Sequence, residues 1–511
     1  MYLGDHARST PDRTAVTMWP SERSVTFGEL YERATKLGNL LRSAGVGPGD
    51  TIAIYSYNHL GYYEAAWAAL MSGLYVTPVN AHSPAEEAAY VIDNCDAKVL
   101  FVSDSTLEVA EQIVEDTPKV RTRLSFDGSR DGYLSVDEAT RDQPSEPTSE
   151  ETLGTYMFYS SGTTGRPKGI KPKMPEAPAS QGDLIDAMRL QFQLDEGGVY
   201  LSPAPLHHAA PLRVSMAALG IGAHVVCMER FDAEQALAAI ERYGVTVSQW
   251  VPTMFIRMLK LPEETRERYD ISSMRRVVHA AAPCPVWVKE RMIEWWGPVI
   301  SEYYAGSENI GSTSIESDEW LEHKGSVGRP SVGEIHICDE DGNELPLGED
   351  GLVYFHLPTT EFEYHGDPDK TASVWHPTEP WRTLGDIGHL DEDGYLYLSD
   401  RATFMIIAGG ANIYPREIED VLVEHPDVVD AAVIGVPDDD LGEVPFAVVQ
   451  AAPESGTDAA VLDDELRVLM REKLARYKLP RQVVFVDDLP RGEDGKLRKK
   501  SLREHYAQAG G

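Results

Sequence analysis

The alternation of short apolar runs with helical patterns is the feature that most constrains the fold. Residues 51–55 read Thr-Ile-Ala-Ile-Tyr, which is typical of a buried strand, and residues 75–79 form a second such run. Between them, residues 62–70 carry apolar side chains at helical spacing. Because two parallel strands joined by a helix need a right-handed crossover, this unit predicts a mostly parallel sheet with helices on its faces.

The same alternation returns further along the chain. Residues 223–228 are strand-like, and residues 245–247 begin another strand. Between these runs, Asp232 can cap the N-terminus of a helix, with Gln235 completing a capping box. The repetition predicts a doubly wound α/β architecture.

Two later stretches depart from the alternation. Residues 127–151 are rich in Asp, Glu, Ser, Thr and Pro, which indicates an exposed connection. Residues 334–354 place strand-like runs beside turn-rich segments, which predicts antiparallel hairpins. After Asp400 the alternation resumes. We therefore predict an α/β protein with two domains: residues 1–400, made of doubly wound α/β subdomains and a β-rich subdomain, and residues 401–511, a small, mobile α+β domain.

Charge and hydropathy exclude several classes of function. The 511 residues include 46 Lys+Arg and 83 Asp+Glu, which gives a net charge of −37. Nucleic acids and anionic membranes recruit clustered basic residues, so neither partner fits. No apolar run reaches the roughly 18 residues of a membrane span, and residues 1–12 lack the apolar core of a signal peptide. The four cysteines form no CxxC pair, so we expect a cytoplasmic protein without membrane insertion.

A glycine- and hydroxyl-rich segment follows the apolar run at residues 155–159. It reads Ser-Ser-Gly-Thr-Thr-Gly-Arg-Pro-Lys-Gly over residues 160–169. Such residues let backbone N–H groups approach phosphate oxygens, and Lys168 adds a positive charge. The Walker A spacing, with Ser or Thr directly after Gly-Lys, is missing. A flexible turn would account for the glycines and serines but not for the paired threonines, so the segment predicts a phosphate-binding loop.

This loop and further motifs, in order from Pro11 to Lys496, closely resemble the adenylate-forming superfamily of acyl-CoA synthetases, non-ribosomal peptide synthetase adenylation domains and luciferases. Residues 279–285 and 295–304 are most similar to bacterial fatty-acyl-CoA and bile-acid-CoA ligases. The resemblance implies two half-reactions. ATP and a carboxylate first give an acyl-adenylate and pyrophosphate. The small domain then rotates, and a thiol attacks the activated acyl group.

The resemblance also implies a nucleotide site. The triphosphate would contact Ser160, Ser161, Gly162, Thr163, Thr164, Gly165 and Lys168. The adenine would lie in a slot made by Ala281, Ala282, Pro283 and Tyr304. The hydroxyl of Ser307 would contact phosphate, and the carboxylate of Glu308 would hold Mg²⁺, a hard ion that prefers oxygen ligands. Asp386 would accept the ribose hydroxyls, and Arg401 would contact the ribose or a phosphate.

Catalytic and thiol-binding residues are implied in the same way. Lys496 matches the catalytic lysine, whose ammonium stabilises charge near the carboxylate and α-phosphate. Taken alone, the basic residues that follow Lys496 in the sequence would indicate a solvated surface. His208 matches the histidine that borders the carboxylate pocket, and it joins Lys496 and Glu308 as a catalytic candidate, with a packed core histidine as the alternative. Gly409 and Gly410 would line the CoA tunnel, where a Cβ would obstruct the close approach of the backbone to the ligand.

The acyl pocket and the hinge show where the chain departs from its relatives. The implied pocket residues are Trp250, Ala305 and Gly306. The small residues Ala305 and Gly306 leave space for a bulky or polycyclic acid. Asn309 stands where a small residue or Gly is more usual, and Ala411 where many relatives carry a larger residue. Thr403 occupies the hinge position, which is usually Asp or Lys, and its β-branched side chain is stiffer.

These features predict an ATP-dependent acyl-CoA ligase, an AMP-forming acid–thiol ligase that uses ATP, Mg²⁺ and coenzyme A. Its small-molecule partner would be a bulky or hydrophobic carboxylic acid. Two alternatives catalyse only one half-reaction: thioesterification of a supplied acyl-adenylate, or adenylation with transfer to a carrier protein. A silent nucleotide-binding regulator is disfavoured by the intact charged residues of the motifs. The motifs leave a homodimer open as the oligomeric state.

Overall fold

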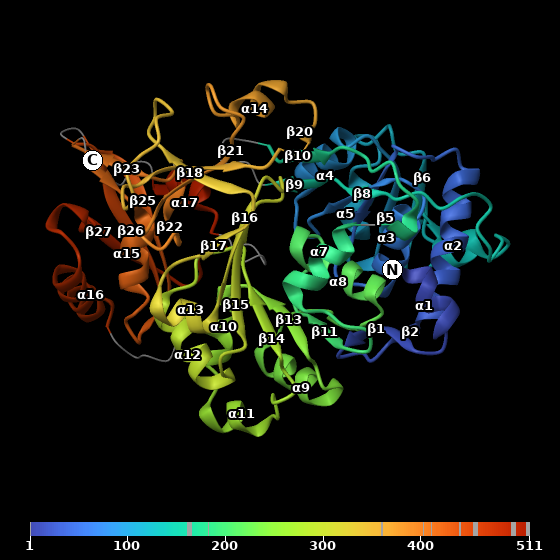
Figure 1. The fold of residues 1–511 in the computed structure, drawn as a ribbon, viewed down its shortest axis with the longest axis horizontal. Coiled ribbons are helices and arrows are strands. Elements are labelled where there is room, and N and C mark those ends of the chain that lie inside the picture. The colour runs from blue at the N-terminus through green and yellow to red at the C-terminus, as the bar shows by residue number, and fades with distance from the viewer. Residues whose placement is uncertain are drawn as a thin grey trace. The chain divides into compact units, whose positions relative to one another are not determined.

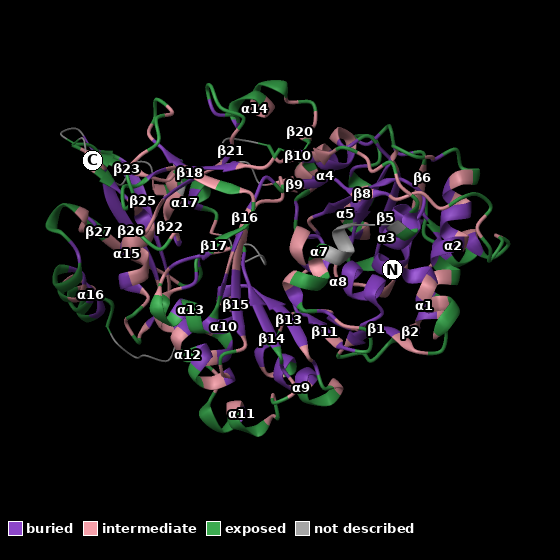
Figure 2. Ribbon diagram, in the orientation of Figure 1, coloured by how far each residue is buried: buried purple, intermediate pink, exposed green. Residues whose placement is uncertain are grey.

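The predicted strand–helix–strand unit is present in the computed structural model (Figure 1). Strands β3 (Thr51–Tyr55) and β4 (Tyr75–Val79) are parallel neighbours, and α3 (Leu60–Leu70) connects them. Every residue of both strands is buried, as expected for a parallel sheet covered on its faces (Figure 2).

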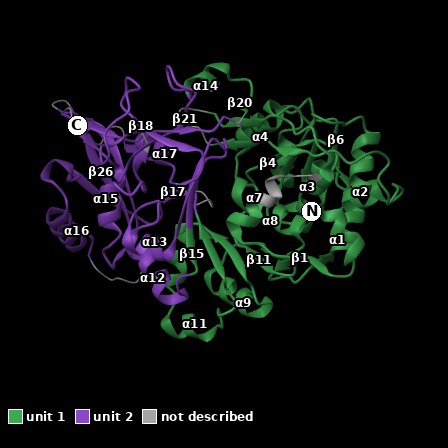
Figure 3. Cartoon of the chain, in the orientation of Figure 1, with its two compact units in different colours: residues 1–279, 299–301, 359–373 green, residues 280–298, 302–358, 374–511 purple. Residues whose placement is uncertain are grey.

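The structure describes residues 2–160, 166–181, 183–358, 361–401, 403–409, 411–438, 441–452, 458–491 and 497–506. The chain divides into two units (Figure 3). Unit 1 comprises residues 1–279, 299–301 and 359–373, and unit 2 comprises residues 280–298, 302–358 and 374–511. The predicted α/β fold class is confirmed, whereas the domain boundary at residue 400 stays a prediction.

Unit 1 contains a six-stranded parallel sheet in the order β7-β6-β5-β3-β4-β8. Its other strands are β5 (Ala97–Val102), β6 (Thr122–Ser125), β7 (Leu134–Ser135) and β8 (Thr155–Tyr156). A second set of strands runs in the order β14-β13-β11-β12-β1-β2. These are β14 (Arg276–His279), β13 (Val247–Trp250), β11 (Val199–Ser202), β12 (His224–Met228), β1 (Thr14–Trp19) and β2 (Ser24–Thr26). All of them pair in parallel except β2, which is antiparallel to β1.

Helices join these strands as the pattern predicted. Helix α3 is buried along almost its whole length because it contacts β3 and β4 of one sheet and β1 of the other. Helix α9 (Ala233–Tyr243) begins at the predicted cap, where the Asp232 side chain accepts a hydrogen bond of 2.9 Å from the backbone N–H of Gln235. The other helices of unit 1 are α1 (Leu3–Ser9), α2 (Phe27–Ser43), α4 (Ala85–Asn94), α5 (Asp104–Gln112), α6 (Val136–Thr140), α7 (Asp183–Phe192), α8 (Ala209–Ile221), α10 (Pro252–Leu259), α11 (Glu263–Arg268) and α14 (Pro368–Ser373).

The strand predicted at residues 155–159 is interrupted. β8 pairs with β4, but β9 (Phe158–Ser160) leaves that sheet and pairs with β10 (Lys168–Pro172). The break falls at Met157, because its N–H still donates to the carbonyl of Val76 while the next residue already lies opposite β10. β20 (Phe362–Tyr364) completes a three-stranded antiparallel sheet on the other side of β10. The hairpin β9–β10 therefore carries the predicted phosphate loop.

Unit 2 contains the predicted antiparallel hairpins. Its four-stranded sheet runs in the order β18 (Glu334–Cys338), β19 (Gly351–His356), β21 (Arg382–Leu390) and β22 (Leu396–Arg401). Unit 2 also contains α12 (Val286–Trp296), the end of β15 (Ile300–Ala305), β16 (Ser312–Glu316), α13 (Ser317–Glu322) and β17 (Arg329–Val332). Pairing between β18 and β19 and between β21 and β22 is antiparallel throughout.

The C-terminal part of unit 2 is a mixed sheet between two layers of helices. The strands are β24 (Ala411–Ile413), β23 (Ile406–Ala408), β26 (Gly442–Ala451), β25 (Val428–Asp438) and β27 (Gln482–Val486). The helices are α15 (Pro415–Leu422), α16 (Ala459–Lys473) and α17 (Lys499–Tyr506). One core cluster lies under α15 and α16 and a second under α17, which is the α+β arrangement predicted for this region. Among the described residues, no helix combines the length and apolar character that crossing a membrane requires.

Candidate active site

The phosphate-loop hairpin places a serine directly opposite a lysine. Ser160 ends β9, Lys168 begins β10, and their Cα atoms are cross-strand partners. The Nζ of Lys168 lies 3.2 Å from the Oδ2 of Asp367, and the lysine side chain is 22% exposed. The predicted loop residues Ser161, Gly162, Thr163, Thr164 and Gly165 lie outside the described residues. The described part thus includes both ends of the loop and both of its cations, Arg166 and Lys168.

Tyr159 anchors this hairpin to the parallel sheet. Its hydroxyl donates a 2.5 Å hydrogen bond to the Oδ1 of Asn94 at the end of α4. Burial raises the pKa of Tyr159, so the phenol stays protonated and can serve as the donor. A Cβ on Gly169, the cross-strand partner of Tyr159, would lie 2.8 Å from the tyrosine ring, which explains the glycine at this position. No local pattern around Tyr159 indicates the contact with Asn94.

In unit 2, the predicted adenine and ribose residues meet. The hydroxyl of Tyr304 donates a 2.5 Å hydrogen bond to the Oδ2 of Asp386, whose residue is only 7% exposed. Strand pairing sets Asp386 directly opposite Arg401, although the side chain of Arg401 is not among those described. A tyrosine hydroxyl from β15 therefore meets a carboxylate from β21, and this carboxylate can accept hydrogen bonds from a nucleoside sugar.

Tyr304→Phe tests this contact. Removing the hydroxyl takes a donor from a buried carboxylate, so we expect ATP to bind about tenfold more weakly and the free energy of unfolding to fall by about 1–3 kcal/mol. Isothermal titration calorimetry with ATP measures the effect. Tyr303→Phe is the matched control, because neighbouring residues on a strand point to opposite faces. Equal affinities for the two variants would show that the Tyr304 hydroxyl does not orient Asp386.

Glu308 lies in a tight turn whose shape explains two neighbouring residues. The N–H of Asn309 donates to the carbonyl of Gly306 at 3.1 Å. A Cβ on Gly306 would lie 2.6 Å from the Leu384 side chain and 2.7 Å from the Oε2 of Glu308. Asn309 has a φ of +57°, in the left-handed region that Gly and Asn adopt at the lowest cost. The departure at this position therefore preserves the turn.

The carboxylate of Glu308 suits Mg²⁺. This ion usually takes one or two protein carboxylates and completes its shell with water and substrate phosphates. Within the described part of the chain, no cluster of three or more His, Cys, Asp or Glu residues could hold a metal by itself. The donor set thus fits a magnesium ion that arrives with a nucleotide.

The predicted adenine segment contains a strained backbone position. Ala281 has a φ of +73°, which residues with a Cβ rarely adopt, and such strain clusters at functional sites. Ala281 and Pro283 are exposed, and Ala282 is half-buried. The following Cys284 is buried, and burial raises the pKa of its thiol, so this cysteine is no competing nucleophile.

The predicted carboxylate-pocket histidine belongs to an aromatic row in unit 1. His208 precedes the first residue of α8, and its ring lies 4.3 Å from that of His207. His207 meets His82 edge-on at 6.3 Å, and the Tyr57 hydroxyl bonds the Nδ1 of His82 at 3.0 Å. His208 is thus half-buried beside other rings, and its role at the carboxylate stays a prediction.

The predicted acyl-pocket residues differ in burial. Trp250 is 1% exposed, donates its indole N–H to Ser248 at 2.5 Å and packs against Phe255, as a core residue does. Ala305 is exposed and Gly306 is half-buried, so these two can face a ligand. The part that Trp250 plays in an acyl pocket stays a prediction.

The predicted thiol-tunnel and hinge residues lie in the C-terminal part of unit 2. Gly409 has a φ of +58°, and its N–H donates to the carbonyl of Leu441 at 2.8 Å. A Cβ there would lie 3.0 Å from the Leu441 side chain, so glycine suits this turn. Thr403 is exposed in a turn. Gly410 and Lys496 lie outside the described residues, and the tunnel, hinge and catalytic assignments stay predictions.

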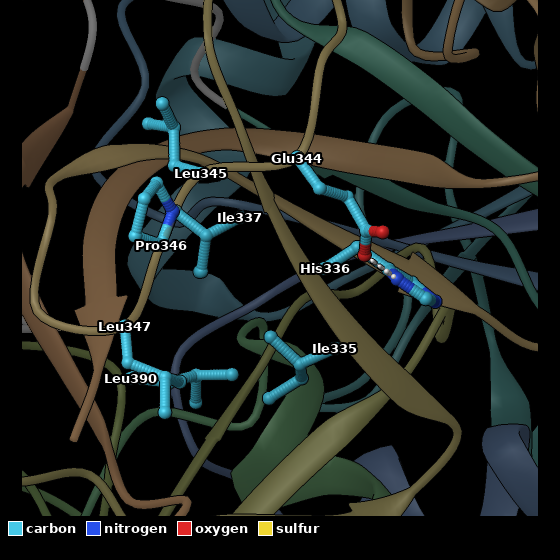
Figure 4. A pocket seen from close by; sticks show the side chains of 8 residues that line it. All are labelled: Ile335, His336, Ile337, Glu344, Leu345, Pro346, Leu347 and Leu390. Carbon is cyan, nitrogen blue, oxygen red and sulfur yellow. Dashed lines mark hydrogen bonds and ion pairs between the residues drawn. The ribbon is translucent and has the colours of Figure 1, made fainter. Parts of the chain in front are cut away.

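A pocket of about 220 Å³ lies elsewhere in unit 2, against β18 (Figure 4). Six of its eight lining residues are apolar, among them Ile335, Ile337 and Leu390. His336 and Glu344 form a 2.6 Å ion pair at its side. No predicted site residue lines this pocket, so it adds nothing to the nucleotide residues described above.

Comparison with known proteins decides the family. A model of the AMP-binding enzyme family matches residues 3–365, and one of the AMP-binding enzyme C-terminal domain matches residues 417–496. The chain belongs to the AMP-binding enzyme family. The predicted membership of the adenylate-forming superfamily is thereby confirmed.

Relatives of this AMP-binding enzyme cover it almost completely. A fatty acid–[acyl-carrier-protein] ligase, ScoC, from Streptomyces coeruleorubidus is 31% identical over 98% of this chain and 95% of its own. A feruloyl-CoA synthase from an Amycolatopsis species is 33% identical over 98% and 97%. The solved structure of the anthranilate CoA ligase AuaEII in complex with anthranoyl-AMP superimposes with a TM-score of 0.85, at 26% identity over 99% and 96% of the two chains.

Proposed function

We propose that this enzyme is an ATP-dependent acyl-CoA ligase. It activates a carboxylic acid as an acyl-adenylate with release of pyrophosphate, and it then transfers the acyl group to coenzyme A with release of AMP. The family match and the relatives support the class of reaction, in agreement with the prediction from sequence. The observation that carries the proposal is the hydrogen bond from Tyr304 to the buried carboxylate of Asp386, because it builds a nucleoside-binding platform at the two predicted positions.

Different residues of the chain bind the two substrates of adenylation, ATP and the carboxylic acid. Lys168 binds phosphate at the hairpin, and Asp386 orients the ribose. Glu308 holds Mg²⁺, which neutralises phosphate charge when bound. Lys496 stabilises the charge that develops where the carboxylate attacks the α-phosphorus. His208 borders the reacting carboxylate.

We infer that the acid is bulky or hydrophobic. Ala305 and Gly306 leave room beside the nucleotide platform, since neither carries a large side chain. Feruloyl-CoA synthase and the anthranilate CoA ligase are named for aromatic acids, and ScoC is named for fatty acids. The proposed location is the cytoplasm, because all four cysteines are buried free thiols.

A second candidate acceptor is the phosphopantetheine thiol of a carrier protein. It rests on one observation, that ScoC is named as a ligase to an acyl-carrier protein and matches nearly the whole chain. The same active site would adenylate the acid in either case, and only the thiol substrate would differ. An enzyme restricted to thioesterification of a supplied acyl-adenylate is the remaining alternative.

Separating the two half-reactions tests these functions. Isotope exchange between pyrophosphate and ATP is measured with a panel of aromatic, fatty, polycyclic and short-chain acids. Thioester formation is then followed with CoA and, separately, with a phosphopantetheinylated carrier protein. We expect acid-dependent exchange and a CoA thioester. If exchange occurs but the only thioester formed is the carrier-bound one, the second acceptor is favoured. If a thioester forms from supplied acyl-AMP but no exchange occurs, the enzyme catalyses thioesterification alone. A preference for acetate or propionate would overturn the inference of a bulky acid. Light scattering on the same sample decides between a monomer and a homodimer.

A further inference from the structure

The phosphate-loop lysine already has an anionic partner within unit 1. The Nζ of Lys168 contacts the Oδ2 of Asp367 at 3.2 Å. Both side chains are partly open to solvent, at 22% for the lysine and 38% for the aspartate. An ion pair with this exposure can exchange one partner for another, because water screens it and can replace either group during the exchange.

The position of Asp367 is fixed by two neighbours. Its Oδ1 accepts a 2.9 Å hydrogen bond from the backbone N–H of Lys370 in the first turn of α14, while its own N–H donates to the carbonyl of Tyr364. The bond from Lys370 and the nearby Lys168 ammonium hold the pKa of Asp367 below its usual range. The carboxylate therefore stays ionised at neutral pH, with one oxygen left for Lys168.

The same sheet carries both partners. Strand β20 pairs with β10 so that Tyr364 lies opposite Ile170, and Asp367 follows three residues after Tyr364. Lys168 begins β10, two residues before Ile170. Asp367 is thus held beside the lysine by backbone pairing and not by the ion pair alone.

We propose that Asp367 is a positioning residue for Lys168, which holds the lysine ammonium before ATP binds and yields it to the phosphates of ATP. The inference rests on the proposed function, in which Lys168 binds the triphosphate. Carboxylate and phosphate compete for one ammonium, so Asp367 lowers the affinity for ATP and pyrophosphate. It also gives Lys168 a partner to return to when pyrophosphate leaves.

Asp367→Asn isolates this charge from the structural role of the residue. Asparagine accepts the Lys370 N–H bond and caps helices as well as aspartate does, so α14 is preserved. Asp369→Asn is the matched control, since it removes one negative charge from the same first turn at an exposed position. Asp367→Ser, a second uncharged cap, guards against an effect peculiar to asparagine.

Calorimetric titration of the full chain with Mg·ATP and with Mg·pyrophosphate tests the proposal. We expect both ligands to bind Asp367→Asn and Asp367→Ser at least about twofold more tightly than wild type, with the gain shrinking in high salt. Asp369→Asn should bind them like wild type, and thermal unfolding should not differ. If wild type binds ATP but the Asp367 variants match Asp369→Asn or bind more weakly, the inference is wrong while the proposed function stands. If wild type binds no ATP, the proposed function fails and the inference fails with it.

Discussion

Replacing Lys289 by methionine is expected to lower the free energy of unfolding of this enzyme by about 3–5 kcal/mol. The Nζ of Lys289, on α12, lies 2.7 Å from the Oε2 of Glu302 on β15, and the two side chains are 0% and 7% exposed. The ammonium also lies 4.8 Å from the centre of the Trp320 ring. Methionine fills much of the same volume, but it leaves the Glu302 carboxylate buried without the cation.

Two further variants separate the charge from the packing. Lys289→Met combined with Glu302→Leu should recover most of the loss, because replacing both members of a buried pair by apolar residues removes the unpaired charge. Lys324→Met is the control. Lys324 pairs with Glu290, which lies on α12 as Lys289 does, but these two side chains are 48% and 34% exposed. The control substitution should therefore lower the free energy of unfolding by at most about 1 kcal/mol. Urea unfolding followed by fluorescence and circular dichroism measures all three. If Lys289→Met lowers the free energy of unfolding no more than the control does, the buried pair contributes little to stability.

The Lys289–Glu302 pair also bears on the nucleotide platform. Residues two apart on a strand point to the same face, so Glu302 and Tyr304 share one side of β15. A Glu302 carboxylate that has lost this cation would draw water toward β15, and the strand would shift to admit it. Weaker ATP binding by Lys289→Met should therefore accompany its lower stability.

Local patterns predicted some strands to the residue and others only approximately, since the strand expected to begin at residue 245 begins at Val247. The strands at residues 51–55 and 75–79 were predicted correctly because a buried parallel strand needs only a short apolar run. The strand at residues 155–159 was not, because its two halves pair with strands from different sheets. Which partner a residue takes is a property of the tertiary structure, and no local pattern encodes the break at Met157.

The same distinction holds for the candidate site. Only the resemblance assigned Tyr304 and Asp386 to one nucleotide site, and their hydrogen bond was not predicted, because these residues are distant in sequence and come from different strands. Asp367 and Lys289 were missed, although each left a weak signal. Asp367 precedes Pro368 at the start of a helix, which is a capping pattern, and Lys289 shares the buried stripe of α12 with Met292. These patterns predict burial or a cap, but they do not identify the oppositely charged partner.

Lys496→Ala is expected to reduce adenylation by about 10²–10³-fold, the usual effect of losing one group that stabilises developing charge. The net charge of −37 makes each local cation matter more, because ATP and a carboxylate are both anions and the protein as a whole repels them. The described flanks of this residue are anchored: Arg491 and Leu497 form a β-bridge, and the buried Lys499 pairs with Glu419 at 2.8 Å. The variant should therefore fold normally.

Comparing the two half-reactions makes the Lys496 prediction specific. If the lysine acts at the α-phosphate, Lys496→Ala should lose pyrophosphate–ATP exchange but still form a thioester from supplied acyl-AMP, since that step no longer involves carboxylate attack on ATP. Lys500→Ala is the control, because Lys500 belongs to the same basic run, is exposed and pairs with Glu504 at 3.9 Å. Rapid-quench measurement of each half-reaction reports the two rates. Equal losses in both steps would place Lys496 in general phosphate binding, and undiminished exchange would remove it from adenylation altogether.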